Sequence, residues 1–321
     1  LREQLPSLLR ADGPERARLE PRADRLFVPM RAATLQLPAA IGAFSDFLSS
    51  IFHTRRMGRN NVPPSYKYQP IAYNSRASSV RVSGETITRP KGEYRTEAGD
   101  VVFGAEPNLD FELELAAFVG PGNALGAPIP IAAAADHIFG YCLLNDWSAR
   151  GIQRWESQPL GPFSGKSFST SISPWIVTAE ALAPFRAPAF RRDAGDPAPL
   201  PHLSHAADQE AGGLAIALEA YWRTGAMRAR GAAPTRVTRT DAEFLYWTFA
   251  QMLTHHTANG ANLRPGDLIA SGTVSGPTDD SRACVAELNG NGATSLTVGD
   301  TKRTWLDDGD EVIFRARAER A

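Results

Sequence analysis

The chain has 321 residues, 43% of them apolar, and a formal net charge of −1 from 34 basic and 35 acidic residues. This length and composition suit one large globular domain, or two smaller ones, with a substantial core. The near-neutral balance excludes the strong basic excess that is typical of a nucleic-acid binder.

The two cysteines, Cys142 and Cys284, lie in apolar surroundings without CxxC spacing. This usage favours neither a disulfide framework nor a zinc site, and a reducing cytoplasm is the expected location. The first residues carry charge throughout, and no uncharged apolar run approaches the roughly 18 residues of a membrane span. We therefore expect no membrane and no nucleic-acid partner.

Residues 1–38 have scattered charge and weak helical periodicity, and we interpret them as a remnant of an N-terminal domain or a linker ahead of a main domain at 39–321. In AIGAFSDFLSSIFH the apolar residues recur at helical spacing, which predicts a helix that places Asp46 and His53 about two turns apart. Residues 60–99 are rich in Pro, Tyr, Ser and Gly, with short alternating pieces such as SVRVSG, and predict a loop-rich sheet edge.

The next segments predict a strand in FELELAAFVG, a short helix in IPIAAAADHIFG, a strand in YCLLNDW, a helix in SARGIQRWE and a strand in KSFSTSISPWIVTAE. Residues 184–213 predict a surface excursion without a core. LAIALEAYWR predicts a strand, and TDAEFLYWTFAQMLTHH predicts a helix that begins with a capping box of Thr240 and Glu243. Strands outnumber helices without a regular βαβ order, so the expected fold class is α+β, predominantly β.

Carboxylates interrupt the core-like stretch DFELELAAFVG. In an extended chain Asp110, Glu112 and Glu114 share one face. On an edge strand such acids ordinarily face water. The alternative is that they face a cation. Asp146, which ends a strongly apolar strand, and Asp46 supply further oxygens. Four carboxylates without cysteine or clustered histidine partners would form a hard, all-oxygen site that suits Mg²⁺ or Ca²⁺.

Long segments of the chain resemble the fumarylacetoacetate hydrolase family. They are SDFLSSIFH, SRASSVRVSG, the run from LDFELELAAFVGPGNALG to KSFSTSISPWIV, YWTFAQMLTHHTANGANLRPGDLIASGTVSGP and DDGDEVI. The resemblance covers nearly everything after residue 39 except the Pro-rich excursion. It implies a mixed β-roll or sandwich, a homodimer and a catalytic domain at 39–321. That domain would use a metal to hydrolyse 4-fumarylacetoacetate to fumarate and acetoacetate, the last step of tyrosine and phenylalanine catabolism.

The resemblance also implies roles for individual residues. The metal ligands would be Asp46, Glu112, Glu114 and Asp146, with Thr170 near the metal, and Asp110 would remain a strand-entry acid. His53, which on its own is more ordinarily a solvated or packed histidine, would be the base, paired with Glu287. Lys166, Gln153 and Arg150 would contact the substrate and stabilise developing negative charge, and Tyr73 and Thr273 would bind the substrate.

The chain departs from the family pattern at four positions: Leu48, Asn74, Gly151 and Ser169 stand where the family has tyrosine, histidine, an acid and glycine. The segment from 53 to 73 is shorter than usual, and Arg55, Arg56 and Arg59 are candidates for the substrate carboxylate by proximity only. Against the family pattern, we also expect the given sequence to lack most of the family's small N-terminal domain and part of its C-terminal tail.

Two alternatives therefore stay open. One is a related diketo-acid (acylpyruvate-type) hydrolase or decarboxylase with altered substrate choice. The other is a catalytically inactive, metal-binding homologue, which the presence of both His53 and Glu287 disfavours because a scaffold has no need of a water-activating pair.

Overall fold

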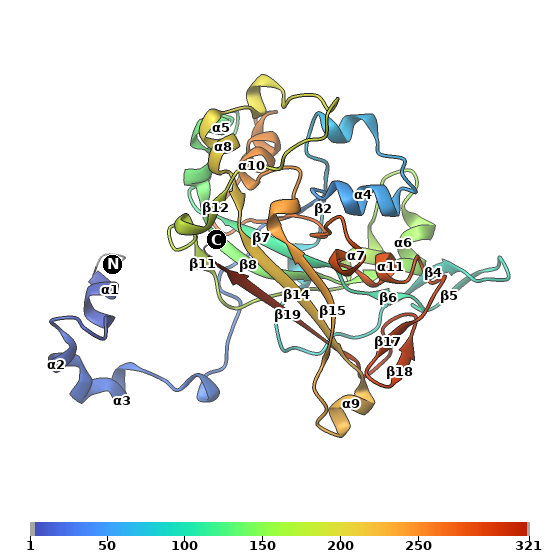
Figure 1. The fold of residues 1–321 in the computed structure, drawn as a ribbon, viewed down its shortest axis with the longest axis horizontal. Helices are drawn as coiled ribbons and strands as arrows, with labels where there is room; N and C mark the ends of the chain where they lie inside the picture. The colour runs from blue at the N-terminus through green and yellow to red at the C-terminus, as the bar shows by residue number, and fades with distance from the viewer. Residues whose placement is uncertain (1–3, 320–321) are drawn as a thin grey trace. The chain divides into compact units, whose positions relative to one another are not determined.

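Figure 1 shows the computed structural model of the chain, in which residues 4–319 are described. Contacts divide the chain into two units, Leu1–Gln36 and Leu37–Ala321. The first unit holds the short helices α1 (Gln4–Leu9), α2 (Arg16–Leu19) and α3 (Ala23–Leu26), and no residue of α2 or α3 is buried. Within residues 4–319, no helix has the length and apolar character needed to cross a membrane.

The centre of the second unit is an eight-stranded mixed sheet with the order β2-β1-β16-β7-β8-β10-β3, in which β11 also pairs with β8. Its strands are β1 (Phe44–Phe47), β2 (Ala72–Asn74), β3 (Val80–Val82), β7 (Leu113–Val119), β8 (Ile138–Asp146), β10 (Thr170–Ile172), β11 (Val177–Thr178) and β16 (Leu268–Ala270). β1 runs parallel to β16, and β10 parallel to β3, whereas the other pairs are antiparallel. Every residue of β7 is buried, as expected for a central strand covered on both faces.

A second, antiparallel sheet has the order β15-β14-β19 and packs on the first (Figure 1). It consists of β14 (Ile216–Arg223), β15 (Thr235–Asp241) and β19 (Glu311–Ala318). Alternate residues of β14 are buried, and Leu218, Ala220 and Trp222 enter the main core. The rings of Phe111 and Phe314 meet edge-on across the two sheets, 5.6 Å apart. The core therefore lies between the sheets.

Short strand pairs and helices complete the unit. The pairs are β4 (Lys91–Arg95) with β5 (Val101–Ala105), β6 (Leu109–Asp110) with β9 (Ser148–Ala149), β12 (Arg186–Ala187) with β13 (Gly213–Leu214), and β17 (Leu296–Val298) with β18 (Thr301–Arg303). The helices are α4 (Ile51–Met57), α5 (Ile131–Ala134), α6 (Arg150–Glu156), α7 (Ser164–Ser167), α8 (Ala206–Ala211), α9 (Gly225–Ala229), α10 (Phe249–Thr257) and α11 (Val285–Leu288). In Figure 1, α5, α8 and α10 gather on one side, and α4, α6, α7 and α11 on another. The predicted α+β class with a mixed sheet is confirmed.

The helix predicted around Asp46 is wrong. Residues 44–47 form β1, and α4 begins only at Ile51, after Ser50 accepts a hydrogen bond from the backbone N–H of His53 (3.2 Å). β1 lies between β2 and β16, and all four of its residues are buried. Its apolar residues therefore do not alternate with polar ones, and the resulting pattern mimics the spacing of a helix. Asp46 therefore projects from a strand, and His53 from a helix.

The predicted start of the long helix at Thr240 is also wrong. β15 runs to residue 241 and a 3-10 turn follows (Ala242–Phe244), after which the backbone stays extended: the N–H of Tyr246 donates to the carbonyl of Ser49 (2.7 Å). The capping box is formed instead by Thr248 and Gln251, and α10 begins after it. Leu245, Tyr246 and Trp247 are large side chains buried along this extended segment, and their run resembles the apolar face of a helix.

The excursion at 184–213 does contribute to the core, contrary to the prediction. Leu203 is fully buried, and its carbonyl accepts a hydrogen bond from the Gln251 side chain (3.0 Å). Asp208 accepts another from the Thr248 hydroxyl (2.8 Å). These two hydrogen bonds, together with the buried Leu203 side chain, attach the proline-rich segment to α10 and its N-cap.

Thr248→Ala should lower the free energy of unfolding by about 1–3 kcal/mol, because it removes the N-cap of α10 and leaves the buried Asp208 carboxylate without that donor. Urea unfolding of the two proteins measures the difference. Thr248→Ser keeps the hydroxyl and serves as the control. Equal stability of the alanine and serine variants would contradict the assignment of this cap.

Candidate active site

Four buried carboxylates come together at the strands of the eight-stranded sheet. Asp46 comes from β1, Glu112 from the position just before β7, Glu114 from the start of β7, and Asp146 from the end of β8. One oxygen of each lies within 4.8 Å of the others. β16 lies between β1 and β7, and β8 pairs with β7, so the sheet order brings these distant residues together.

The donor set fits a hard divalent cation. Asp46 Oδ1 and both oxygens of Glu114 are buried and accept no hydrogen bond from the described residues. Unpartnered carboxylate oxygens are costly to bury unless a cation meets them. An all-carboxylate set matches the oxygen preference of Mg²⁺, Ca²⁺ and similar ions. The four residues can therefore hold a divalent metal.

The pKa values of these acids show how crowded the charges are. Burial, reinforced by the charge of Asp146, raises the pKa of Asp46 well above its usual value. Burial and the neighbouring Asp46 do the same for Glu114. Burial also opposes ionisation of Glu112, but Lys166 and Arg150 outweigh it and hold the pKa of Glu112 below its usual value.

Lys166 and Arg150 supply the positive charge. The ammonium group of Lys166 donates to Glu112 and to Asp146 Oδ2 (2.9 Å). Burial disfavours its charge, but the charges of Asp146 and Glu112 raise the pKa of Lys166 above its usual value, so it stays an ammonium. The Arg150 guanidinium donates to Glu112 (2.6 Å), Asp110 (2.8 Å) and Gln153 Oε1 (3.0 Å).

Asp110 does more than the strand-entry role assigned to it. It is fully buried, and its two oxygens accept from the backbone N–H groups of Val285 (2.6 Å) and Ala286 (3.1 Å) at the start of α11. Its partner Arg150 also holds Glu112, so one carboxylate links α11 to the acidic cluster.

Hydroxyl groups complete the surroundings of Asp146. The Tyr73 hydroxyl donates to Asp146 Oδ2 (2.7 Å), and burial together with the charge of Asp146 raises the pKa of Tyr73 well above its usual value. Thr170 donates to Asp146 Oδ1 (3.1 Å). Thr273 is buried in the segment after β16. The structure therefore brings Tyr73 and Thr170 to the acidic cluster. The family resemblance implied that Thr170 lies near the metal and that Tyr73 binds the substrate, and these roles stay predictions.

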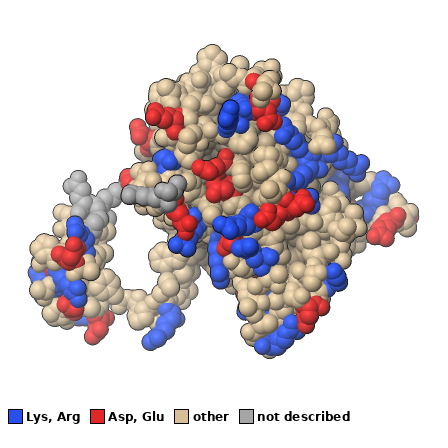
Figure 2. Space-filling view, viewed as in Figure 1, with Lys and Arg blue, Asp and Glu red and all other residues tan. Residues whose placement is uncertain are grey.

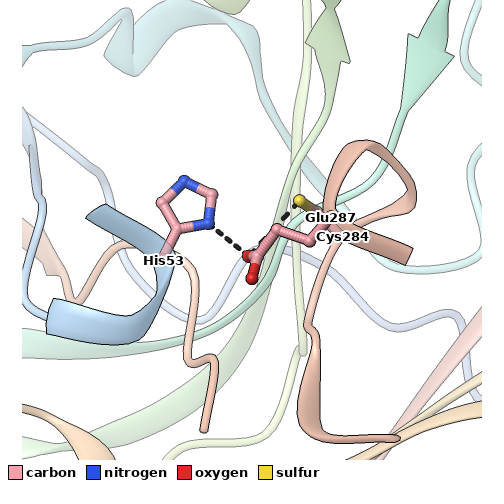
Figure 3. A group of neighbouring side chains, drawn as sticks. All are labelled: His53, Cys284 and Glu287. Carbon is pink, nitrogen blue, oxygen red and sulfur yellow. Dashed lines mark hydrogen bonds and ion pairs between the residues drawn. The ribbon is translucent and has the colours of Figure 1, made fainter. Parts of the chain in front are cut away.

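A second group lies beside the cluster, where α4 faces α11 (Figure 3). His53 Nδ1 pairs with Glu287 Oε1, although the two residues are 234 positions apart in the chain. Glu287 Oε1 also accepts from Ser275 (2.6 Å) and, weakly, from the Cys284 thiol (3.6 Å). Burial opposes ionisation of Glu287, but His53, Ser275 and Arg56 outweigh it and lower its pKa to about 2. Glu287 is therefore an anion that accepts the Nδ1 proton of His53, which leaves Nε2 as the acceptor nitrogen.

Backbone pairing joins this group to the acidic cluster. Glu112 forms an isolated antiparallel bridge with Cys284, and the N–H of Leu113 donates to the Ala283 carbonyl (3.0 Å). The histidine pair and the carboxylates thus belong to one site.

Arginines gather on α4, where Figure 2 shows basic side chains clustered. Arg56 donates to Glu287 Oε2 (2.9 Å) and to the carbonyls of Gly276 (2.8 Å) and Pro277 (3.0 Å). Arg55 pairs with Asp193 at the surface (2.7 Å). Two of the three candidates for a substrate carboxylate are therefore engaged elsewhere. The sequence analysis missed the contacts of Arg56 and Ser275 with Glu287; Ser275 lies two positions after Thr273, in a segment already singled out.

The protein family described as "Fumarylacetoacetate (FAA) hydrolase C-terminal" matches this chain over residues 43–318. The chain belongs to this family. Fumarylacetoacetase of Oryza sativa subsp. japonica is 45% identical over 322 residues, which cover 98% of this chain and 73% of the rice protein. The human fumarylacetoacetase is 45% identical over 296 residues, covering 90% of this chain and 68% of the human one. The resemblance predicted from the motifs is confirmed.

Solved structures share the family fold. Fumarylpyruvate hydrolase from Pseudomonas aeruginosa, in complex with Mn²⁺ and pyruvate, superposes with a TM-score of 0.51 at 19% identity and covers 91% of this chain and 94% of its own. At this identity the likeness supports the architecture alone.

One departure from the family pattern has a clear structural reason. At Gly151, a Cβ atom would lie 2.8 Å from Glu106 Oε1, which accepts the backbone N–H of Gly151 (2.9 Å). Glu106 also accepts the N–H of Ile152 (2.9 Å) and so caps α6. An acid at position 151 would collide with this cap and repel it.

Replacing Glu114 by Gln should weaken divalent-metal binding at least about tenfold, because it removes a charged ligand whose oxygens have no other partner. Isothermal titration with Mg²⁺ or Mn²⁺ measures the affinity, and thermal unfolding shows whether added metal still stabilises the protein. Glu93→Gln, at an exposed carboxylate on β4, is the control. Unchanged affinity in Glu114→Gln would remove Glu114 from the metal site.

Proposed function

We propose that this chain is a fumarylacetoacetase, which hydrolyses the carbon–carbon bond of 4-fumarylacetoacetate to give fumarate and acetoacetate, the last step of tyrosine and phenylalanine catabolism. The observation that carries this proposal is the buried His53–Glu287 pair beside a four-carboxylate cluster, in a chain 45% identical to proteins of that name. A proton acceptor and a site for a hard cation are the two elements that such a hydrolysis needs.

The proposed metal is Mg²⁺ or Ca²⁺, held by Asp46, Glu112, Glu114 and Asp146. When bound, such an ion supplies Lewis-acid polarisation of a β-diketone and stabilises negative charge that develops on its oxygens. Thr170 and Tyr73 hold Asp146 in place through hydrogen bonds to its two oxygens.

In this proposal His53 is the general base. Its Nε2 takes a proton from water while Nδ1 stays bonded to Glu287, and the hydroxide adds to the ketone carbonyl carbon of the fumaryl group, which becomes a carboxylate of fumarate. When the carbon–carbon bond breaks, its electron pair remains with the acetoacetate part. The protonated Nε2 then returns the proton to that carbon. Glu287 fixes the tautomer and balances the charge of the imidazolium.

Lys166 and Gln153 would act on the oxygen that gains charge. Lys166 is an ammonium group at the edge of the carboxylate cluster. The Gln153 Oε1 accepts from Arg150, which directs the amide NH₂ away from that contact as a donor for the substrate. The Arg150 guanidinium donates to Asp110, Glu112 and Gln153, so its proposed role is to hold Glu112 and Gln153. Tyr73 and Thr273 remain the proposed substrate-binding groups.

A homodimer and a cytoplasmic location also remain proposals, supported by the family resemblance and by two free, buried cysteines. The alternative of an acylpyruvate-type substrate keeps one specific support: Arg55 and Arg56 are occupied by Asp193 and Glu287. The inactive-homologue alternative has less support because both members of the histidine pair are present.

His53→Ala should lower kcat for fumarylacetoacetate by about 10²–10⁴ while leaving the affinity for Mg²⁺ unchanged, because it removes the proposed base and none of the four carboxylates of the acidic cluster. The assay follows loss of substrate in parallel with acylpyruvates, using the wild type as reference. Higher kcat/KM for an acylpyruvate in the wild type would replace the proposed substrate. Undiminished turnover in His53→Ala would refute the proposed base.

Arg56→Gln should lower kcat about tenfold or more with little change in KM, because the buried Glu287 loses a charge-assisted hydrogen bond and no longer holds His53 firmly. Arg56→Lys should recover part of the rate by restoring the charge. Arg55→Gln, on the same helix but paired with the surface Asp193, is the matched control. Equal effects at positions 55 and 56 would show that Arg56 has no special role.

A further inference from the structure

His53, Cys284 and Glu287 form a second possible metal-ligand set, chemically distinct from the carboxylate cluster. A ring nitrogen of His53, the Cys284 sulfur and a Glu287 oxygen all lie within 4.8 Å of one another (Figure 3). All three residues are buried, and His53 is only 6% exposed. Tetrahedral zinc, with bonds of about 2.0–2.3 Å, needs ligand atoms roughly 3–4 Å apart, and the Cys284 sulfur lies 3.6 Å from Glu287 Oε1.

We propose that these three residues form an inhibitory site for a thiophilic divalent cation of the Zn²⁺ class. Nitrogen, sulfur and oxygen together are the donors that Zn²⁺ prefers, whereas the neighbouring four carboxylates are a hard set suited to Mg²⁺ or Ca²⁺. The two sites therefore select different ions, although Glu112 and Cys284 are bridged through their backbones.

The surrounding contacts favour three-ligand binding. Arg56 holds Glu287 Oε2 (2.9 Å), which leaves Oε1 directed at His53 and Cys284, where it also accepts from the Ser275 hydroxyl (2.6 Å). One thiolate and one carboxylate balance the two charges of the ion, and the imidazole binds as a neutral ligand. Burial raises the pKa of the Cys284 thiol well above its usual value, so the ion must displace the thiol proton, which passes to solvent.

The same geometry explains why binding would inhibit. The nitrogen available to this site is His53 Nδ1, which faces Glu287. When Nδ1 binds the ion, the ring proton moves to Nε2, and Nε2 can no longer accept a proton from water. The inhibition rests on the proposed role of His53 as base, whereas the binding does not.

Cobalt binding tests the site without any catalytic assay. Co²⁺ added to protein already saturated with Mg²⁺ should give a thiolate-to-cobalt charge-transfer band in the near ultraviolet. The band should be lost in Cys284→Ser and Cys284→Ala and kept in Cys142→Ser, which alters the other buried cysteine. Absence of the band in the wild type, or its persistence in both Cys284 variants, would overturn the proposed site.

Inhibition is tested in the same proteins. With Mg²⁺ in excess, Zn²⁺ should inhibit the wild type and Cys142→Ser, and a chelator in small excess over Zn²⁺ should reverse the effect. In Cys284→Ser the half-inhibitory Zn²⁺ concentration, measured against that variant's own uninhibited rate, should rise at least about tenfold. Equal inhibition with and without Cys284 would place the inhibitory ion at the carboxylate cluster and refute the proposal. A cobalt band without zinc inhibition would refute the inhibitory role, whereas the role of His53 as base is decided separately by the turnover of His53→Ala.

Discussion

The burial of four carboxylates against one another is the constraint on which the rest of the site depends. Like charges in a poorly polarisable interior repel strongly, and the raised pKa values of Asp46 and Glu114 express that repulsion. Lys166 relieves part of it through Glu112 and Asp146. Asp46 Oδ1 and both oxygens of Glu114 still have no hydrogen-bond partner among the described residues, and a bound cation would neutralise them. Metal binding should therefore stabilise this part of the fold.

The position of the histidine pair also depends on its connection to the acidic cluster. Asp110 fixes the start of α11 through two backbone N–H groups, and Arg150 ties Asp110 to Glu112. α11 in turn carries Glu287, which holds His53. The proposed base His53 and the proposed metal ligand Glu112 are therefore connected by a buried, charge-assisted network, although they lie on distant parts of the chain. Such a network gives the precision that a two-component active site requires.

Strand alternation was enough to place Glu112 and Glu114 on one face, and the cost of burying a lone acid singled out Asp146. The same kind of reasoning failed for Asp46, because a strand buried on both faces carries no period-two signal. The pairing of His53 with Glu287 spans 234 positions and came only from the family resemblance. Contacts made to backbone carbonyls, such as those of Arg56, depend on loop conformation and leave no pattern in the sequence.

The use of Arg56 also bears on substrate recognition. Glu287 needs a positive partner because it is a buried carboxylate, and Arg56 meets this need from α4. A guanidinium committed to Glu287 and to two carbonyls has few donors left for a substrate carboxylate. The charge that activates His53 and the charge that would recognise the far end of a diketo acid must therefore come from different residues. Under the proposed function, substrate choice in this chain can then change without disturbing the pairing of His53 with Glu287.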